Sequence, residues 1–87
     1  SIIPLENNDP SFLVYPNPVV HSFYLKNKDE NGMVDLVLLD NLGTKVLQLN
    51  ALQPGSAIDI SSLPVGVYQV LIKTPEYIES ELVVKMK

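Results

Sequence analysis

The side chains that could support catalysis are few and lie far apart in this sequence. The chain has 87 residues, a single histidine and no cysteine. Covalent catalysis needs a nucleophile, a base and a group that orients the base. His21 is the only imidazole available, and no motif surrounds it or any of the serines. We therefore expect His21 to be a turn or surface residue and the chain not to be an enzyme.

One acidic segment, Asp29–Gly32, has the composition of part of a calcium loop. Such a loop needs further acidic ligands and a closing glutamate at a fixed spacing, which this sequence lacks, so a hairpin turn explains the segment better. The absence of cysteine excludes thiolate metal sites and disulfides, and no glycine-rich phosphate loop is present. We expect no metal and no other cofactor.

The charge balance excludes a further class of function. Six basic residues, all lysines, against ten acidic residues give a net charge of −4. Arginine is the side chain that binds phosphate or guanine through two parallel hydrogen bonds, and an acidic surface repels nucleic acids. We therefore expect no nucleic-acid partner.

Short β-rich runs alternate with turn signals along the chain, a pattern typical of β-sandwiches and barrels. Any functional residues must therefore be positioned by strands and the turns between them. We predict strands at Phe12–Tyr15, Ser22–Lys26, Met33–Asp40, Lys45–Asn50, Ala57–Ile60, Val67–Thr74 and Glu79–Met86. The predicted fold class is all-β, a seven-stranded antiparallel β-sandwich of Ig-like or Greek-key type. Residues 1–10 are predicted to be a linker from an upstream protein, and residues 11–87 the folded domain.

Alternation along the predicted strands assigns side chains to two faces. We predict a core of Phe23, Leu25, Val34, Leu36, Leu38, Ile58, Ile60, Leu63, Tyr68, Val70, Ile72, Leu82, Val84 and Met86. The opposite face also carries apolar residues. Either loops or the Ile2–Leu5 segment cover them, or they form an exposed docking stripe made of Val37, Leu39, Leu71 and Val83.

Two proline-containing motifs and one turn have roles that their residue types define. The prolines on either side of Asn17 fix the backbone, while Asn17 can bond nearby backbone groups. Asp40 and Gly43 close a tight turn.

The third motif, Leu63–Tyr68, is expected to form a sharp corner. We expect Leu63 to fill the core and Pro64 and Gly66 to force the sharp entry into the next strand, with a positive φ at Gly66 if the corner requires it. We expect the buried Tyr68 ring to reach back to loop backbone with its hydroxyl.

Taken in order, these motifs resemble the type A C-terminal sorting domain of the type IX, or Por, secretion system of Gram-negative bacteria. The resemblance rests on V-Y-P-N-P at 14–18, a hydrophobic strand leading to D-x-x-G at 34–46, and L-P-x-G-x-Y at 63–68. A final strand with Lys85 and Lys87 completes it, so that it covers residues 12–87.

The resemblance implies that other proteins read this domain as an address. The implied partners are the outer-membrane translocon, shuttle and sortase proteins of the type IX system, and the sortase usually removes the domain. The implied route runs through the periplasm to the outer-membrane surface or the extracellular space. The residues that we expect to carry recognition are Tyr15, Pro16, Asn17, Pro18, Asp40, Gly43, Leu63, Pro64, Gly66, Tyr68, Lys85 and Lys87.

Two further expectations concern contacts with partners. The terminal strand is expected to be an edge strand that offers unpaired backbone groups to a partner. A weak homodimer is expected through the docking stripe or through edge strands. Two alternative functions stay open: an uncleaved partner-binding domain of a surface machinery, and an adhesion or carbohydrate-binding sandwich. The absence of tryptophan and of clustered aromatic residues argues against the second.

Overall fold

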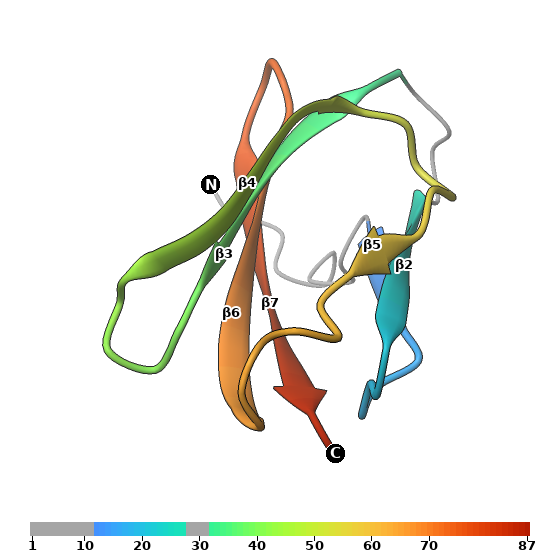
Figure 1. The fold of residues 1–87 in the computed structure, drawn as a ribbon. Helices are drawn as coiled ribbons and strands as arrows, with labels where there is room; N and C mark the ends of the chain where they lie inside the picture. Colours follow the sequence, from blue (N-terminus) through green and yellow to red (C-terminus); the bar gives the residue numbers. More distant parts are fainter. Residues whose placement is uncertain (1–11, 28–31) are drawn as a thin grey trace, which may run out of the picture.

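The computed structural model describes residues 12–27 and 32–87, and all the regular elements in these two ranges are β-strands (Figure 1). They are β1 (Phe12–Tyr15), β2 (Ser22–Asn27), β3 (Val34–Leu39), β4 (Lys45–Leu52), β5 (Ile58–Asp59), β6 (Gly66–Lys73) and β7 (Ile78–Lys85). The seven predicted strands are confirmed. The predicted linker, the Ile2–Leu5 segment and all of Asp29–Gly32 except its glycine lie outside the described residues.

The strands form two antiparallel sheets that enclose the core. One sheet has the order β1-β2-β5 and the other the order β4-β3-β6-β7. Figure 1 shows the larger sheet on the left, with β2 and β5 on the right. The predicted all-β class and two-sheet architecture are therefore confirmed.

The core contains the inward residues that alternation predicted for β2, β3, β5 and β6. The side chains of Leu36, Leu38, Val70 and Ile72 have no exposed surface. Fully burying one such side chain contributes about 1.5–3 kcal/mol to stability. Leu63 packs against this core, as predicted, but it is only partly buried. The sequence reasoning did not identify three further core residues, Phe12, Val14 and Val19.

The prediction for β7 was wrong, because the opposite set of side chains faces the core. Val83 is fully buried, whereas Leu82 is 60% and Met86 46% exposed, and Val84 lies on the outer face. The ladder places Val83 opposite Tyr68, and residues directly opposite each other share a face. Apolar residues occupy both faces of this strand, so only the pairing register could decide which set is buried.

Candidate recognition site

The sequence motifs meet at one end of the sandwich, where β7 ends and β6 begins (Figure 1). Gly66, within the third motif, pairs with Lys85 near the end of the chain. We call this end, comprising residues 16–19, 40–43, 63–68 and 85–87, the motif end. Motifs that are up to 70 residues apart in the sequence thus lie on one small part of the surface.

The side chain of Asn17 takes the place of a peptide group beside β7. Its Nδ2 donates a hydrogen bond to the carbonyl oxygen of Leu82, and its Oδ1 accepts one from the amide of Val84, both at 2.9 Å. A residue of a parallel strand lying opposite Val83 would make the same two bonds. The side-chain amide therefore forms one step of a parallel ladder.

Val19 makes the next step of this ladder with its own backbone. Its amide donates to the carbonyl oxygen of Val84 at 2.8 Å, and its carbonyl oxygen accepts from the amide of Met86 at 2.7 Å. Prolines have no amide hydrogen to donate, so the Asn17 side chain supplies what the backbone of Pro16–Pro18 lacks. The expected backbone bonds of Asn17 exist, but they reach a strand 65 residues away and not nearby groups.

This ladder corrects two expectations about the terminal strand. Backbone groups between Leu82 and Met86 are already bonded, so this part of the β7 edge is not unpaired. The side chain of Lys85 is only 5% exposed, and its Nζ donates to the carbonyl oxygen of Met86. Lys85 therefore does not present its charge to a partner, whereas Lys87 is exposed.

Asp40 organises the turn between β3 and β4 as the sequence predicted. Its Oδ1 accepts hydrogen bonds from the amides of Leu42 and Thr44, each at 2.9 Å. Its carbonyl oxygen accepts one from the amide of Gly43, whose φ is +83°. Residues that have a Cβ atom rarely adopt this backbone conformation, which explains why the D-x-x-G motif ends in glycine.

The predicted tyrosine anchor is present in the third motif. Tyr68 is 4% exposed, and its hydroxyl donates a hydrogen bond of 2.6 Å to the carbonyl oxygen of Pro64. Gly66 does not have the positive φ that the sharp corner could have required, and a Cβ built on it meets no atom within 4 Å. The corner is therefore fixed by the bond from Tyr68 and not by an unusual glycine conformation.

A cavity of about 240 Å³ lies between the second and third motifs. Asp40, Asn41 and Val46 line one side of it, and residues 64–68 line the other. Burial, and then the negative charge of Asp40, raises the pKa of the Tyr68 hydroxyl. The hydroxyl therefore keeps its proton at neutral pH and remains a hydrogen-bond donor.

Large apolar side chains are exposed around the motif end, although its tyrosine and backbone groups are bonded internally. Such side chains in one region indicate an interaction surface. They are Val20, Leu42, Val65, Val67 and Met86, with exposed fractions between 41% and 83%.

The outer face of the larger sheet carries an apolar stripe, but its composition differs from the predicted one. Val37 lies opposite Leu71 on the adjacent strand, both half-buried. Val83 was wrongly assigned to this face, since it lies in the core. With β7 in its observed register, the outer stripe consists of Val37, Leu39, Val67, Leu71, Leu82 and Val84.

Two of the four tyrosines form a pair, contrary to the expectation that no aromatic residues cluster. The rings of Tyr15 and Tyr24 stack with centroids 5.6 Å apart and planes inclined by 26°. They lie opposite each other on β1 and β2. Tyr15 also lines a groove of about 420 Å³, with Lys26 and Gln53 among the other lining residues.

The one histidine lies on the surface directly before β2, as expected. His21 is exposed, and its carbonyl oxygen accepts a bond from the amide of Ile60. Hydrogen bonds from Ser61, and to a smaller degree the charge of His21, lower the pKa of Asp59.

Residues 12–27 and 32–87 contain no group of three His, Cys, Asp or Glu side chains that could hold a metal ion. These ranges also contain no helix long and apolar enough to cross a membrane.

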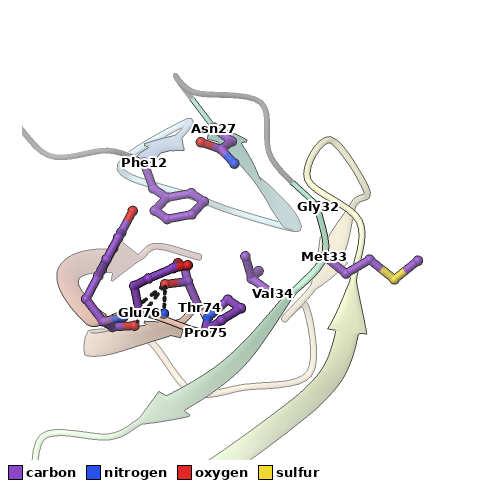
Figure 2. Close-up of a pocket in the computed structure, with 9 residues that line it drawn as sticks. Phe12, Asn27, Gly32, Met33, Val34, Thr74, Pro75 and Glu76 are labelled. Carbon is purple, nitrogen blue, oxygen red and sulfur yellow. Dashed lines mark hydrogen bonds between the residues drawn. The ribbon is translucent and has the colours of Figure 1, made fainter.

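The opposite end of the sandwich has a larger cavity of about 500 Å³, which contains none of the motif residues. Figure 2 shows Phe12 and Val34 on either side of it, with the turn Thr74–Tyr77 closing one edge. The Thr74 Oγ1 accepts bonds from the amides of Glu76 and Tyr77, which hold this turn. The lining has no cluster of chemically reactive side chains among the described residues.

Comparison with known families agrees with the positions of the motifs. The sequence pattern of the family described as secretion system C-terminal sorting domain matches residues 13–85, which is nearly the whole chain. No curated protein matches the chain significantly. Members of this family serve as sorting signals for type IX secretion and are not an enzyme family. The chain belongs to the family of type IX secretion system C-terminal sorting domains.

Proposed function

We propose that the type IX machinery recognises this domain as a folded unit, through its motif end, and carries the attached protein from the periplasm to the cell surface. The family assignment supports export as the task. We choose the motif end as the recognised surface because all the motifs converge there. Exposed apolar side chains, among them Val65 and Leu42, lie around it.

The motif residues divide into two groups by role. Asn17, Asp40 and Tyr68 use their polar atoms on this chain's own backbone, so their function is to fix the shape of the motif end. The exposed apolar side chains around them are the groups that contact the translocon or a shuttle protein. Burying each of them would contribute about 1.5 kcal/mol before the cost of association.

We further propose that the domain is removed once the attached protein has been exported to the cell surface. A sortase of the type IX system cuts within or before residues 1–10, where Pro4, Pro10 and the adjacent asparagines are typical of extended linkers. Mass spectrometry of the surface-exposed product would locate the cut. A product that retains residues 12–87 would support the alternative, an uncleaved domain that binds a partner of the surface machinery.

A fusion experiment tests the export function. A passenger protein with an N-terminal secretion signal is joined to residues 1–87 and expressed in a bacterium that has the type IX system. Protease accessibility on intact cells should show the passenger on the surface, and the passenger without the domain should stay in the periplasm. Equal retention of both would contradict the proposal.

A second candidate function is supported by the tyrosine pair. Aromatic faces stack on sugar rings, and Lys26 and Gln53 beside Tyr15 supply groups that can bond hydroxyls or carboxylates. A carbohydrate-binding sandwich would lose affinity for polysaccharide when Tyr15 is changed to alanine. Unchanged retention of the Tyr15→Ala domain on a polysaccharide column would remove this candidate.

A further inference from the structure

The cavity of about 240 Å³ at the motif end combines apolar walls with hydrogen-bond acceptors. Val46, Val65 and Val67 supply apolar surface, and the ring of Tyr68 lies among the lining residues. The Tyr68 hydroxyl donates its proton to the carbonyl oxygen of Pro64, so its own oxygen can act only as an acceptor, and the carbonyl oxygen can accept a second bond. A ligand that complements these groups has an apolar stem and a hydrogen-bond donor at its tip.

Asp40 adds a negative charge to this cavity, and only one of its carboxylate oxygens is in use. Its Oδ1 accepts hydrogen bonds from the amides of Leu42 and Thr44, whereas no group in the described part of the chain donates one to Oδ2. Burial, and then the charge of Asp40, raises the pKa of the Tyr68 hydroxyl, which places the carboxylate close enough to act on it. The donor that fits best is therefore positively charged.

The two lysines that adjoin the motif-end turns bond elsewhere. Lys45 directly follows the β3–β4 turn, and its Nζ donates to Oε1 of Gln48 at 2.6 Å. The Nζ of Lys85 donates to the carbonyl oxygen of Met86 at 2.9 Å. Within residues 12–27 and 32–87, neither ammonium group forms an ion pair with Asp40.

The two segments outside the described residues are attached at the opposite end of the sandwich. Residues 1–11 lead into Phe12, and residues 28–31 join Asn27 to Gly32. Figure 2 shows these three attachment residues around the larger cavity of that end. Residues 1–11 also contain two acidic residues and no basic residue, so they bring no cationic side chain to the motif end.

We propose that the motif-end cavity receives a lysine side chain of the protein that recognises this domain, with its ammonium group at Asp40 and its carbon stem along the valine wall. Long basic side chains commonly bury their stems along apolar surface in this way. The inference rests on the proposed export function, because it names the side chain that the recognised surface takes.

The state of the carboxylate favours lysine over arginine. Arginine binds a carboxylate most strongly through two parallel bonds to both oxygens, and Oδ1 of Asp40 already accepts two amides. A lysine ammonium is a compact charge with three donors. It can bond Oδ2 of Asp40 and still reach the oxygen of Tyr68 or Pro64.

Charge also disfavours two other occupants. Each copy of this chain has a net charge of −4, and like-charged molecules repel, so a second copy is a poor source of the lysine. A wholly apolar side chain would cover the half-buried Asp40 carboxylate without giving it a partner, which costs the hydration of that charge.

A titration followed by NMR tests the ligand chemistry. The probe is N-acetyl-lysine amide, and the matched probes are the norleucine amide, which lacks the ammonium group, and the arginine amide. The lysine probe should shift the amides of Thr44 and Val67 saturably, with a Kd on the order of 1–10 mM, and leave Met33 at the opposite end unchanged. The arginine probe should bind about threefold more weakly and the norleucine probe at least about tenfold more weakly. Equal binding of the three probes, or no saturable shift, would overturn the proposal.

A charge substitution locates the binding group. Asp40→Asn keeps an oxygen that can accept the two turn amides and removes the charge, so the lysine probe should bind at least about tenfold more weakly. Asp35→Asn is the matched control, because Oδ1 of Asp35 also accepts a backbone amide and the residue lines a cavity with Met33 at the other end. Equal lysine binding to the two folded variants would contradict the assignment to Asp40.

Salt dependence tests the same charge without any substitution, in case Asp40→Asn fails to fold. Raising the NaCl concentration from about 0.02 M to about 0.5 M should weaken lysine binding to the unsubstituted domain about twofold or more, because salt screens the attraction. Binding of the norleucine probe should not weaken. A lysine affinity that does not change with salt would count against the ion pair.

The export assay separates this inference from the function on which it rests. Failure of the unsubstituted fusion to reach the surface counts against the export function alone. The Asp40→Asn fusion should be displayed less than the Asp35→Asn fusion. Export of the unsubstituted fusion, together with no lysine binding or with equal display of the two folded variants, overturns the lysine site and leaves the export function standing.

Discussion

Asn17 shows how one side chain determines the packing of a segment whose backbone cannot pair by itself. Proline on both sides removes two amide donors, and the Asn17 side chain restores a donor and an acceptor in the geometry of a parallel ladder. The residue order of the P-N-P motif therefore has a structural cause: the amide side chain lies between the two residues that cannot donate.

The first prediction concerns the removal of this side-chain amide. Asn17→Ala leaves the Leu82 carbonyl and the Val84 amide without partners, and we expect a loss of about 1–2 kcal/mol in the free energy of unfolding. Chemical denaturation measures it. The control is Asn41→Ala, at an exposed position in the β3–β4 turn, which should change stability much less. Equal effects of the two substitutions would show that the ladder step contributes nothing specific.

The second prediction uses the raised pKa of Glu81. A carboxyl group with a raised pKa binds its proton more tightly in the folded state, so its contribution is fully present below the unfolded pKa and is lost as the pH rises through the folded pKa. Glu81→Gln should therefore raise the melting temperature at pH 7 and change it little at pH 4. The exposed Glu76→Gln is the control. A lower melting temperature for Glu81→Gln at pH 7 would contradict the assignment.

At the scale of the element, the β3–β4 turn and the corner before β6 use glycine for different reasons. Gly43 has a φ of +83°, whereas Gly66 has no positive φ. Gly43→Ala should cost about 1–2 kcal/mol in unfolding free energy, because a side chain is disfavoured in that conformation. Gly66→Ala should cost less, as judged by thermal melts. The reverse order would mean that the corner, and not the turn, is the strained element.

The terminal strand is also a structural element, which changes how a truncation must be interpreted. Because Lys85 and Lys87 were expected to carry recognition, removing residues 83–87 would be expected to delete a recognition signal. Val83 is fully buried, and Val84 and Met86 bond with Val19, so this truncation removes part of the core as well. Loss of export in such a variant would report unfolding, and substitutions at exposed positions are the better test.

The sequence was sufficient for the strands and for most of the core, because polar residues such as Asp35, Gln69 and Lys73 mark the outer face of β3 and β6. It was insufficient for β7, where Leu82, Val83 and Val84 are all apolar and only pairing with β6 selects the buried one. The turn at Asp40 and the hydroxyl bond of Tyr68 were predictable, since both are local. The contact of Asn17 with β7 was not, because no local pattern specifies a partner 65 residues away.

At the scale of the whole molecule, the outer stripe offers a second surface through which domains could associate. Leu71 lies in its centre, opposite Val37. Leu71→Lys should keep the fold, as judged by circular dichroism, and shift any concentration-dependent dimer to monomer in sedimentation measurements. Leu36→Lys is the matched control, and it should unfold the domain because Leu36 is fully buried. Unfolding of the Leu71 variant would place this residue in the core and remove the stripe as an interaction surface.

The central claim, that the type IX machinery reads the motif end of the folded domain, is tested most directly by matched surface substitutions in the exported fusion. Val65→Asp places a charge at the motif end, and Met33→Asp places one at the opposite end, at side chains that are 57% and 55% exposed. Both variants should remain folded by circular dichroism. The account predicts that the Val65→Asp fusion accumulates in the periplasm while the Met33→Asp fusion reaches the surface. Equal surface display of the two folded variants would contradict it.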